Sequence, residues 1–268
     1  MSIGRVEMKI GCCAYSFRQY LTSGKMTLED FLDKAVEMGL DGVELTAYYF
    51  PSTDTSYLNK IKREAFLRGL EISGTAVGNN FCKPDPEERR EQIEMVKKWI
   101  DISYHLGAPC IRVFAGGVPK GHTEEEAFNW VVDALKECVE YAAPKGVIIA
   151  LEDHGGITTT AEQVLKIYRA VGSEWLGINL DTGNFRVNPY EEIAAVAPYA
   201  VTTHAKVEIL NPQTGKREPA DFARIVDILH KAGYRGFLSI EYEAAEDPMT
   251  GVPKFVEYLR SVLRRASG

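Results

Sequence analysis

Short runs of apolar and β-branched residues alternate with longer segments of helical periodicity along the whole of this 268-residue chain. A parallel sheet wrapped by helices requires this alternation, because each strand is followed by a crossover helix before the next strand begins. Eight such pairs can be counted. The expected strands are Lys9–Ala14, Gly42–Ala47, Glu71–Val77, Cys110–Ala115, Val147–Leu151, Leu176–Leu180, Val201–His204 and Phe237–Ile240.

Eight such strands favour a closed barrel over an open sheet. Strands covered on both faces read as continuous hydrophobic runs, and closure leaves no strand edge exposed. A barrel of this type commonly takes about 250 residues, and no linker divides the chain. We therefore expect a single α/β domain, a (β/α)8 TIM barrel, over residues 1–268. An open dinucleotide-binding sheet has little support, because Gly11-Cys12-Cys13-Ala14 stands where its G-x-G-x-x-G turn would lie.

The helix signals agree with this alternation. Thr27 is a typical N-cap, the acids Glu29 and Asp30 suit the first turn, and Gly39 is a usual terminator. The helices expected between and after the strands include Thr27–Met38, Ala161–Ala170, Pro189–Ala197, Asp221–Ala232 and Val252–Arg264.

Charge and composition exclude several classes of partner. The net charge of -7 disfavours nucleic acid, which needs clustered Lys and Arg. Met1–Lys9 lacks an apolar signal core and no run of eighteen apolar residues follows, so we expect no membrane partner and a cytoplasmic location. The five cysteines are odd in number and lack paired C-x-x-C spacing, which indicates neither a disulfide framework nor a thiolate zinc site; we expect several of them to lie in or beside strands as small apolar residues.

Four consecutive strands lead into residues that bind metals: Glu152, Asp181, His204 and Glu241. Strand ends converge at one mouth of a barrel, whereas a single polar residue there could equally cap a helix or pair with a lysine. Three carboxylates placed together repel one another unless a cation compensates. We therefore expect one divalent metal ion, with Mn²⁺ or Mg²⁺ favoured and Co²⁺ or Zn²⁺ as alternatives because a histidine is present.

Two further residues follow these ligands at a spacing of two. His154 follows Glu152 and Lys206 follows His204, so both side chains are expected to face the mouth. His154 would then contact substrate or carry a proton, or else hold a hydrogen bond at the rim. Lys206 would hold a substrate oxygen or form a structural ion pair.

Three more charged residues are candidates for contact with a small-molecule substrate. Arg112 could bind a substrate carboxylate or phosphate, or pair with Glu44 or Glu152. Glu44 could serve that pairing or touch substrate. Arg217, in an expected polar loop, could close over a substrate or remain solvated.

Taken together, the residues resemble the sugar phosphate isomerase/epimerase superfamily, also described as xylose-isomerase-like barrels. The resemblance spans nearly the whole chain. It is carried by Gly42-Val43-Glu44-Leu45, Ile111-Arg112-Val113-Phe114-Ala115-Gly116, Leu151-Glu152-Asp153-His154, Leu180-Asp181-Thr182-Gly183-Asn184, His204-Ala205-Lys206, and Gly233-Tyr234-Arg235-Gly236 leading to Ile240-Glu241.

The resemblance implies that Glu152, Asp181, His204 and Glu241 are metal ligands. It also implies that Glu152 and Glu241 flank the substrate on opposite faces, one removing a proton beside a carbonyl and the other returning a proton. Asn184, where many relatives have histidine, and the additional carboxylate Asp153 depart from the family pattern.

The expected function is that of a divalent-metal-dependent isomerase or epimerase acting on a small sugar, keto-polyol or related carbonyl compound through an enediolate. The alternative is a metal-dependent dehydratase of the dehydroshikimate or inosose type, which also begins by removing a proton beside a carbonyl. A non-catalytic sugar-binding barrel is a third hypothesis, which an intact ligand set argues against. Homo-oligomerisation is left open.

Overall fold

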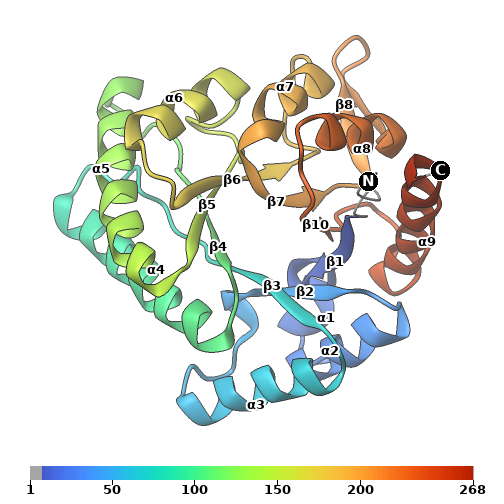
Figure 1. The fold of residues 1–268 in the computed structure, drawn as a ribbon. Helices are drawn as coiled ribbons and strands as arrows, with labels where there is room; N and C mark the ends of the chain where they lie inside the picture. Colours follow the sequence, from blue (N-terminus) through green and yellow to red (C-terminus); the bar gives the residue numbers. More distant parts are fainter. Residues whose placement is uncertain (1–7, 268) are drawn as a thin grey trace, which may run out of the picture.

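The computed structural model of the chain describes residues 8–267. Its central sheet is a closed barrel in the order β1-β10-β7-β6-β5-β4-β3-β2, with parallel pairing throughout, which confirms the expected fold. Figure 1 shows the strands as an inner ring and the helices as an outer ring. The barrel strands are β1 (Lys9–Cys13), β2 (Gly42–Thr46), β3 (Glu71–Ala76), β4 (Cys110–Val113), β5 (Ile148–Glu152), β6 (Leu176–Asp181), β7 (Ala200–Ala205) and β10 (Phe237–Ile240).

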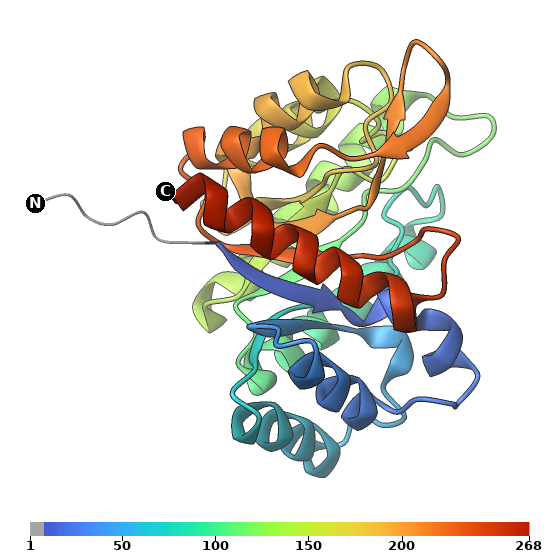
Figure 2. The same cartoon turned by 90° about the vertical axis from the view of Figure 1, so that its right-hand side faces the viewer.

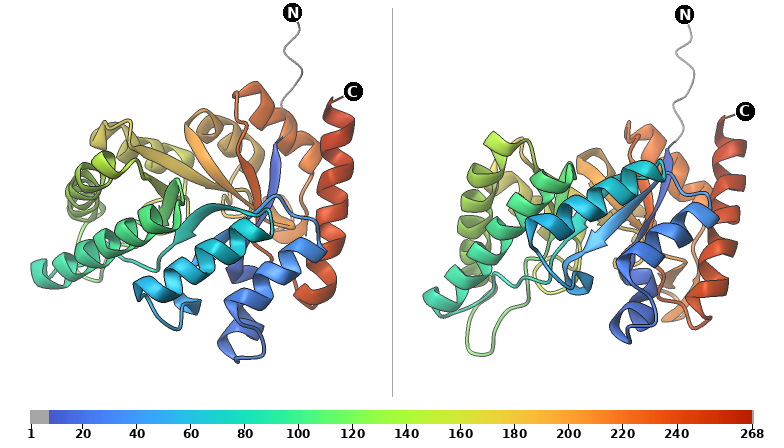
Figure 3. Two further views of the ribbon diagram at one scale, coloured as in Figure 1. Left: turned by 60° about the horizontal axis from the view of Figure 1, so that its bottom comes forward. Right: turned by 90° about the horizontal axis from the view of Figure 1, so that it is seen from below.

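The outer helices follow one another around the barrel, each packed against the next from α2 to α9. Figure 3 shows α2, α3 and α4 side by side over the strands near the start of the chain. The helices are α1 (Arg18–Thr22), α2 (Leu28–Glu37), α3 (Thr55–Leu67), α4 (Pro86–Leu106), α5 (Glu124–Ala142), α6 (Ala161–Val171), α7 (Pro189–Val196), α8 (Phe222–Lys231) and α9 (Pro248–Ser267).

The first long helix, α2, begins where its sequence predicts. The Thr27 side chain accepts a hydrogen bond from the Asp30 backbone N–H at 3.1 Å, and the Asp30 carboxylate accepts one from the Thr27 N–H at 2.8 Å. This capping box satisfies two backbone donors that a helix leaves unpaired at its start. Because Leu28, Phe31 and Leu32 lie on one face, the capped helix buries an apolar stripe against the barrel.

Close packing between neighbouring strands fixes the position of β2 beside β3. A Cβ atom added to Gly42 would lie 2.6 Å from the Glu71 carbonyl oxygen and 2.9 Å from the Phe237 ring. Only glycine fits at this point, so the start of β2 lies close to both neighbours. The barrel is thereby held tightly at the end opposite the metal-binding candidates.

Helix α9 begins earlier than the sequence suggested, at Pro248 rather than Val252, because Asp247 caps it. The Asp247 carboxylate accepts a hydrogen bond from the Met249 N–H at 2.8 Å, and the Asp247 carbonyl accepts one from the Gly251 N–H at 2.8 Å.

The expected polar loop after β7 is instead an antiparallel hairpin, β8 (Glu208–Asn211) and β9 (Lys216–Pro219). The hairpin, orange in Figure 2, extends from the side of the barrel where the strand arrows end. Its β9 residues are all exposed, so no alternation of apolar residues marked the strand in the sequence.

Several general expectations can be compared with the described part of the chain. All five cysteines are free and buried, as expected. None of the helices within residues 8–267 is long and apolar enough to cross a bilayer. The expectation about the amino-terminal segment concerns mainly residues 1–7, which lie outside the described residues.

Candidate metal centre

The ends of four neighbouring strands bring Glu152, Asp181, His204 and Glu241 together. Glu152 ends β5, Asp181 ends β6 at the level of His204 in β7, and Glu241 directly follows β10. One ligand atom from each residue lies within 4.8 Å of the others, and all four side chains are buried. Nδ1 of His204 lies 3.4 Å from Glu241 Oε2, 3.5 Å from Glu152 Oε2 and 3.8 Å from Asp181 Oδ2.

Two of the carboxyl groups are poorly compensated by their surroundings. Burial raises the pKa of Asp181 to about 6, despite the opposing effect of Lys206. Burial also raises the pKa of Glu152, despite Arg112 and His204. Oδ2 of Asp181 is buried and accepts no hydrogen bond from the described residues, although Lys206 Nζ lies 3.4 Å away. A cation at this point would supply the missing partner.

The third carboxylate and the histidine hold opposite charges in the metal-free protein. Burial acts to raise the pKa of Glu241, but His204 and Lys206 lower it well below its usual value. Burial acts to lower the pKa of His204, but Glu241, Glu44 and Glu152 raise it well above its usual value. The two residues therefore form a charged pair that a metal ion would replace by displacing the proton of His204.

Glu44 fixes the orientation of His204. Nε2 of His204 lies 3.0 Å from Oε1 and 3.1 Å from Oε2 of Glu44, with both side chains buried. This contact leaves Nδ1 facing the three carboxylates. A carboxylate behind a histidine is a common support for a metal ligand, because it fixes which ring nitrogen carries the proton. The pairing of Glu44 with His204 was not indicated by the sequence.

Arg112 lies behind Glu152 rather than beside Glu44. Its Nε is 3.1 Å from Glu152 Oε2, and its Nη1 donates to the Val77 carbonyl at 2.8 Å. The guanidinium also lies 4.0 Å from the centre of the Phe114 ring. The pairing of Arg112 with Glu152, one of the two considered from the sequence, is thus present, and it fixes the position of the Glu152 carboxylate.

His154 lies at the exposed rim, outside the buried cluster. Its ring packs against the Phe114 ring, with centroids 4.3 Å apart and ring planes inclined by 41°, and its backbone N–H donates to Thr158 Oγ1 at 3.2 Å. Burial of part of the ring and the nearby Arg112 lower the pKa of His154. The imidazole is therefore neutral near pH 7.

Lys206 forms the ion pairs that were considered for it. Its Nζ contacts the carboxylates of Glu241 and Glu243. A hollow of about 190 Å³ beside it is lined by Lys206, Glu208, Arg217 and Glu243. Arg217 is exposed on β9, and its guanidinium donates to the Gly183 carbonyl at 3.5 Å. The hairpin thus carries Arg217 back toward the mouth.

A second hollow at the mouth is larger and aromatic. It has a volume of about 820 Å³ and lies where β1 and β2 end. Its lining includes Tyr15, Arg18, Tyr48, Tyr49 and Phe50. Neither hollow is lined by the four candidate ligands themselves; the smaller one is next to the cluster through Lys206.

Sequence reasoning missed three residues beside the cluster. Asn179 Nδ2 donates to Glu152 Oε2 at 3.1 Å, Glu243 contacts Lys206, and the Cys13 sulfur lies close to His204 and Glu241. Asn179 and Glu243 each lie two residues from a ligand, so strand alternation could have identified them. Cys13 is the last residue of β1, so attention to strand ends could have identified it as well.

Asp153 and Asn184 lie beside the centre and outside the ligand set. The Asp153 carboxylate is buried and accepts from the Asp181 backbone N–H at 2.7 Å, so it supports the end of β6. Asn184 Nδ2 lies 3.5 Å from Glu152 Oε1. Each of the two residues thus contacts a candidate ligand or the backbone beside one.

Comparisons with known proteins agree with this architecture. The family model described as "Xylose isomerase-like TIM barrel" matches residues 32–262. L-ribulose-5-phosphate 3-epimerase UlaE of Escherichia coli K12 is 26% identical over 276 residues, covering 93% of this chain and 94% of that protein.

Two solved structures have the same fold. D-psicose 3-epimerase with D-tagatose from Clostridium cellulolyticum H10 has a TM-score of 0.79 at 18% identity, covering 96% of this chain and 99% of that chain. A xylose isomerase-like TIM barrel protein from Mycobacterium smegmatis in complex with magnesium has a TM-score of 0.77 at 18% identity, covering 97% and 98%.

Proposed function

The chain belongs to the family of xylose isomerase-like TIM barrels, and we propose that this enzyme is a divalent-metal-dependent epimerase or isomerase of a small sugar or keto-polyol. Similar proteins support the proposal, since UlaE is named as a 3-epimerase of a ketose phosphate and a structural neighbour as a 3-epimerase of a ketohexose. The single observation that carries it is the buried cluster of three carboxylates and one imidazole at the carboxyl end of the barrel.

The donor set fits a divalent ion. Metal ligands lie about 2.0–2.6 Å from such an ion. Ligand atoms within 4.8 Å of one another can therefore bind the same ion after small movements of their side chains. The buried Oδ2 of Asp181, which accepts no hydrogen bond from the described residues, supports the same conclusion. Glu152, Asp181, His204 and Glu241 would hold the ion, which when bound would polarise a substrate carbonyl as a Lewis acid.

Glu152 and Glu241 are suited to exchange a proton with the carbon beside that carbonyl. Their pKa values shift in opposite directions, with that of Glu152 raised by burial and that of Glu241 lowered by His204 and Lys206 against its burial. These directions hold for the metal-free protein, and they show that the two carboxyl groups lie in different environments, as those of an acid and base pair do. One removes the proton to give an enediolate, and the other returns a proton to the opposite face.

The surrounding residues keep this pair in position. Arg112 contacts Glu152, and Lys206 contacts Glu241. The neutral imidazole of His154 and the guanidinium of Arg217 lie at the rim, where we assign them to substrate hydroxyl groups. Each of these groups binds the substrate or orients a neighbouring carboxylate, and none has to move during the reaction.

Proton exchange in deuterium oxide tests the proposal. The Mn²⁺-loaded protein is incubated with ketopentoses, ketohexoses and their phosphates, and deuterium at the carbon beside the carbonyl is followed by NMR. We expect the wild type to exchange deuterium and to form an epimer or isomer with at least one compound. Exchange should be lost in Glu152→Gln and Glu241→Gln. It should be normal in Glu71→Gln, because Glu71 is the first residue of β3 and lies at the end of the barrel opposite the metal centre.

The products distinguish the competing hypotheses. A product that has lost water would identify a dehydratase. A protein that binds Mn²⁺ and sugar tightly but exchanges no proton would be a binding barrel and would overturn the enzymatic proposal.

A further inference from the structure

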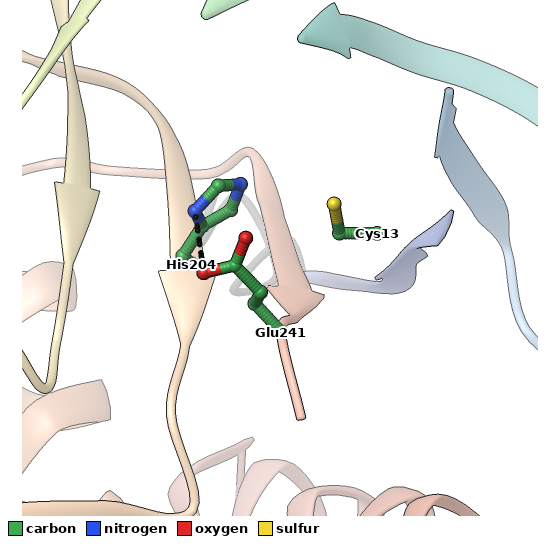
Figure 4. A group of neighbouring side chains, drawn as sticks. All are labelled: Cys13, His204 and Glu241. Atoms are coloured by element: carbon green, nitrogen blue, oxygen red, sulfur yellow. Dashed lines mark ion pairs between the residues drawn. The ribbon is translucent and has the colours of Figure 1, made fainter. Parts of the chain in front are cut away.

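Cys13 contributes a thiol to the same space as the metal centre. Its sulfur, a ring nitrogen of His204 and a carboxylate oxygen of Glu241 all lie within 4.8 Å of one another. Figure 4 shows the three side chains, which come from β1, β7 and the end of β10 and project into one space. All three are buried.

The neighbouring Cys12 provides a contrast on the same strand. Successive side chains on a strand point to opposite faces. Cys12 packs within the hydrophobic core, whereas Cys13 lies outside that cluster and has Thr46 Oγ1 at 3.5 Å from its sulfur. The two thiols therefore have different surroundings, and Cys13 alone faces His204 and Glu241.

We propose that Cys13, His204 and Glu241 form a second ligand set for a borderline-soft divalent ion such as Zn²⁺ or Co²⁺. This inference rests on the proposed function, because the set takes two of its three ligands from the four-residue centre. The two sets share His204 and Glu241, so they cannot be filled independently. Cys13 thereby makes the site sensitive to which ion is available.

Ligand chemistry separates the two sets. Three carboxylates and an imidazole suit hard ions such as Mn²⁺ and Mg²⁺, whereas a thiolate favours Zn²⁺. A thiolate, a carboxylate and a neutral imidazole carry two negative charges, which balance a divalent ion. Three protein ligands also leave the fourth tetrahedral position of Zn²⁺ free.

Binding to the second set requires the thiol to lose its proton. The incoming ion forms bonds to the sulfur and to a ring nitrogen of His204, and the thiol proton and the extra proton of His204 leave to solvent. No oxidant or reductant takes part.

Occupation of the second set has a consequence for activity. Glu241 would be held by the soft ion in an arrangement that excludes Glu152 and Asp181, and it could no longer exchange a proton with substrate. We therefore expect Zn²⁺ to inhibit the Mn²⁺-loaded enzyme, and Cys13→Ser to be less sensitive to Zn²⁺.

Cobalt absorption provides a direct readout, since Zn²⁺ has no d–d spectrum. Metal-stripped wild type, Cys13→Ser, Glu152→Gln and the matched control Cys12→Ser are titrated with Co²⁺, and Mn²⁺ binding is measured separately. We expect a thiolate-to-cobalt charge-transfer band in the wild type and in Cys12→Ser, and none in Cys13→Ser. Glu152→Gln should keep the band while its affinity for Mn²⁺ falls more than about tenfold.

The outcomes separate this inference from the proposed function. Co²⁺ binding to the wild type without a thiolate band, or a band that persists in Cys13→Ser, overturns the role of Cys13 and leaves the four-residue centre standing. A band that depends on Cys13 in a protein that binds no Mn²⁺ supports the second set and contradicts the proposed centre. Wild type that binds neither ion overturns both.

Discussion

Replacing Glu44 with glutamine tests how the fold prepares His204 to bind a metal. Both carboxylate oxygens of Glu44 lie within 3.1 Å of His204 Nε2, and the two side chains are 2% and 0% exposed. Glutamine has nearly the same shape, but it removes the negative charge behind the Nε2–H. Without that charge the ring is a weaker metal ligand through Nδ1, the nitrogen that faces the metal site.

The expected loss can be estimated from this geometry. Removing the group behind a metal-bound histidine typically costs about 10–100-fold in metal affinity, which corresponds to about 1.4–2.7 kcal/mol. We expect a value near the upper end, because the contact is buried and water cannot replace it.

Calorimetric titration of metal-stripped protein with Mn²⁺ above pH 7 measures this loss. The matched control is Glu71→Gln, the same change at an exposed carboxylate that pairs with Lys9 at the other end of the barrel. Glu71→Gln should bind Mn²⁺ as the wild type does. A folded Glu44→Gln protein with Mn²⁺ affinity within about twofold of wild type would refute the reasoning.

Two further predictions concern acidity and packing. Since burial raises the pKa of Asp181 from its usual 3.8 to about 6, the metal-free native state binds this proton more tightly than the unfolded chain. Its contribution to stability is therefore present below about pH 4 and is lost as pH rises through about 6. Metal binding has the opposite dependence: it already weakens with falling pH because His204 must lose its proton, and it weakens more steeply as pH falls through about 6, by about tenfold per pH unit for each proton displaced. Thermal melting of stripped wild type and Asp181→Asn between pH 4 and 8, with Mn²⁺ titrations at the same pH values, checks both signs; identical pH profiles for the two proteins would contradict the assignment. For packing, Gly42→Ala should lower the free energy of unfolding by about 1–3 kcal/mol, because the new methyl group would meet the Glu71 carbonyl at 2.6 Å. Gly117→Ala, whose Cβ would have its nearest contact at 3.7 Å, is the control, and equal denaturant midpoints for these two variants would show that the contact is not tight.

The eight strands were predictable because each is a short apolar run that is followed by polar residues or a turn. Phe237–Ile240 was predicted with the bounds that the structure has, and Thr27 was recognised as an N-cap from its own chemistry and that of the acids after it. The β8–β9 hairpin was not predictable in the same way. Its second strand, β9, is exposed and contains no alternating apolar pattern, so its backbone pairing with β8 alone defines it.

The candidate site was predictable only in part, for a physical reason. Four strand ends pointed to Glu152, Asp181, His204 and Glu241, because barrel geometry alone brings these positions together. The partners behind them depend on contacts across the barrel: Glu44 is 160 residues from His204 in sequence, and Cys13 comes from the first strand. Strand spacing indicates which way such side chains point, but not which neighbour each one meets.

Metal content is the most direct test of the central claim that these four residues bind one divalent ion. Elemental analysis of protein loaded with Mn²⁺ and freed of excess ion should find one ion per chain in the wild type and in Glu71→Gln. It should find much less than one in Asp181→Asn, where the carboxylate oxygen that lacks a hydrogen bond is removed. A wild-type protein that retains no ion, or an Asp181→Asn protein that retains as much as the wild type, would contradict the account.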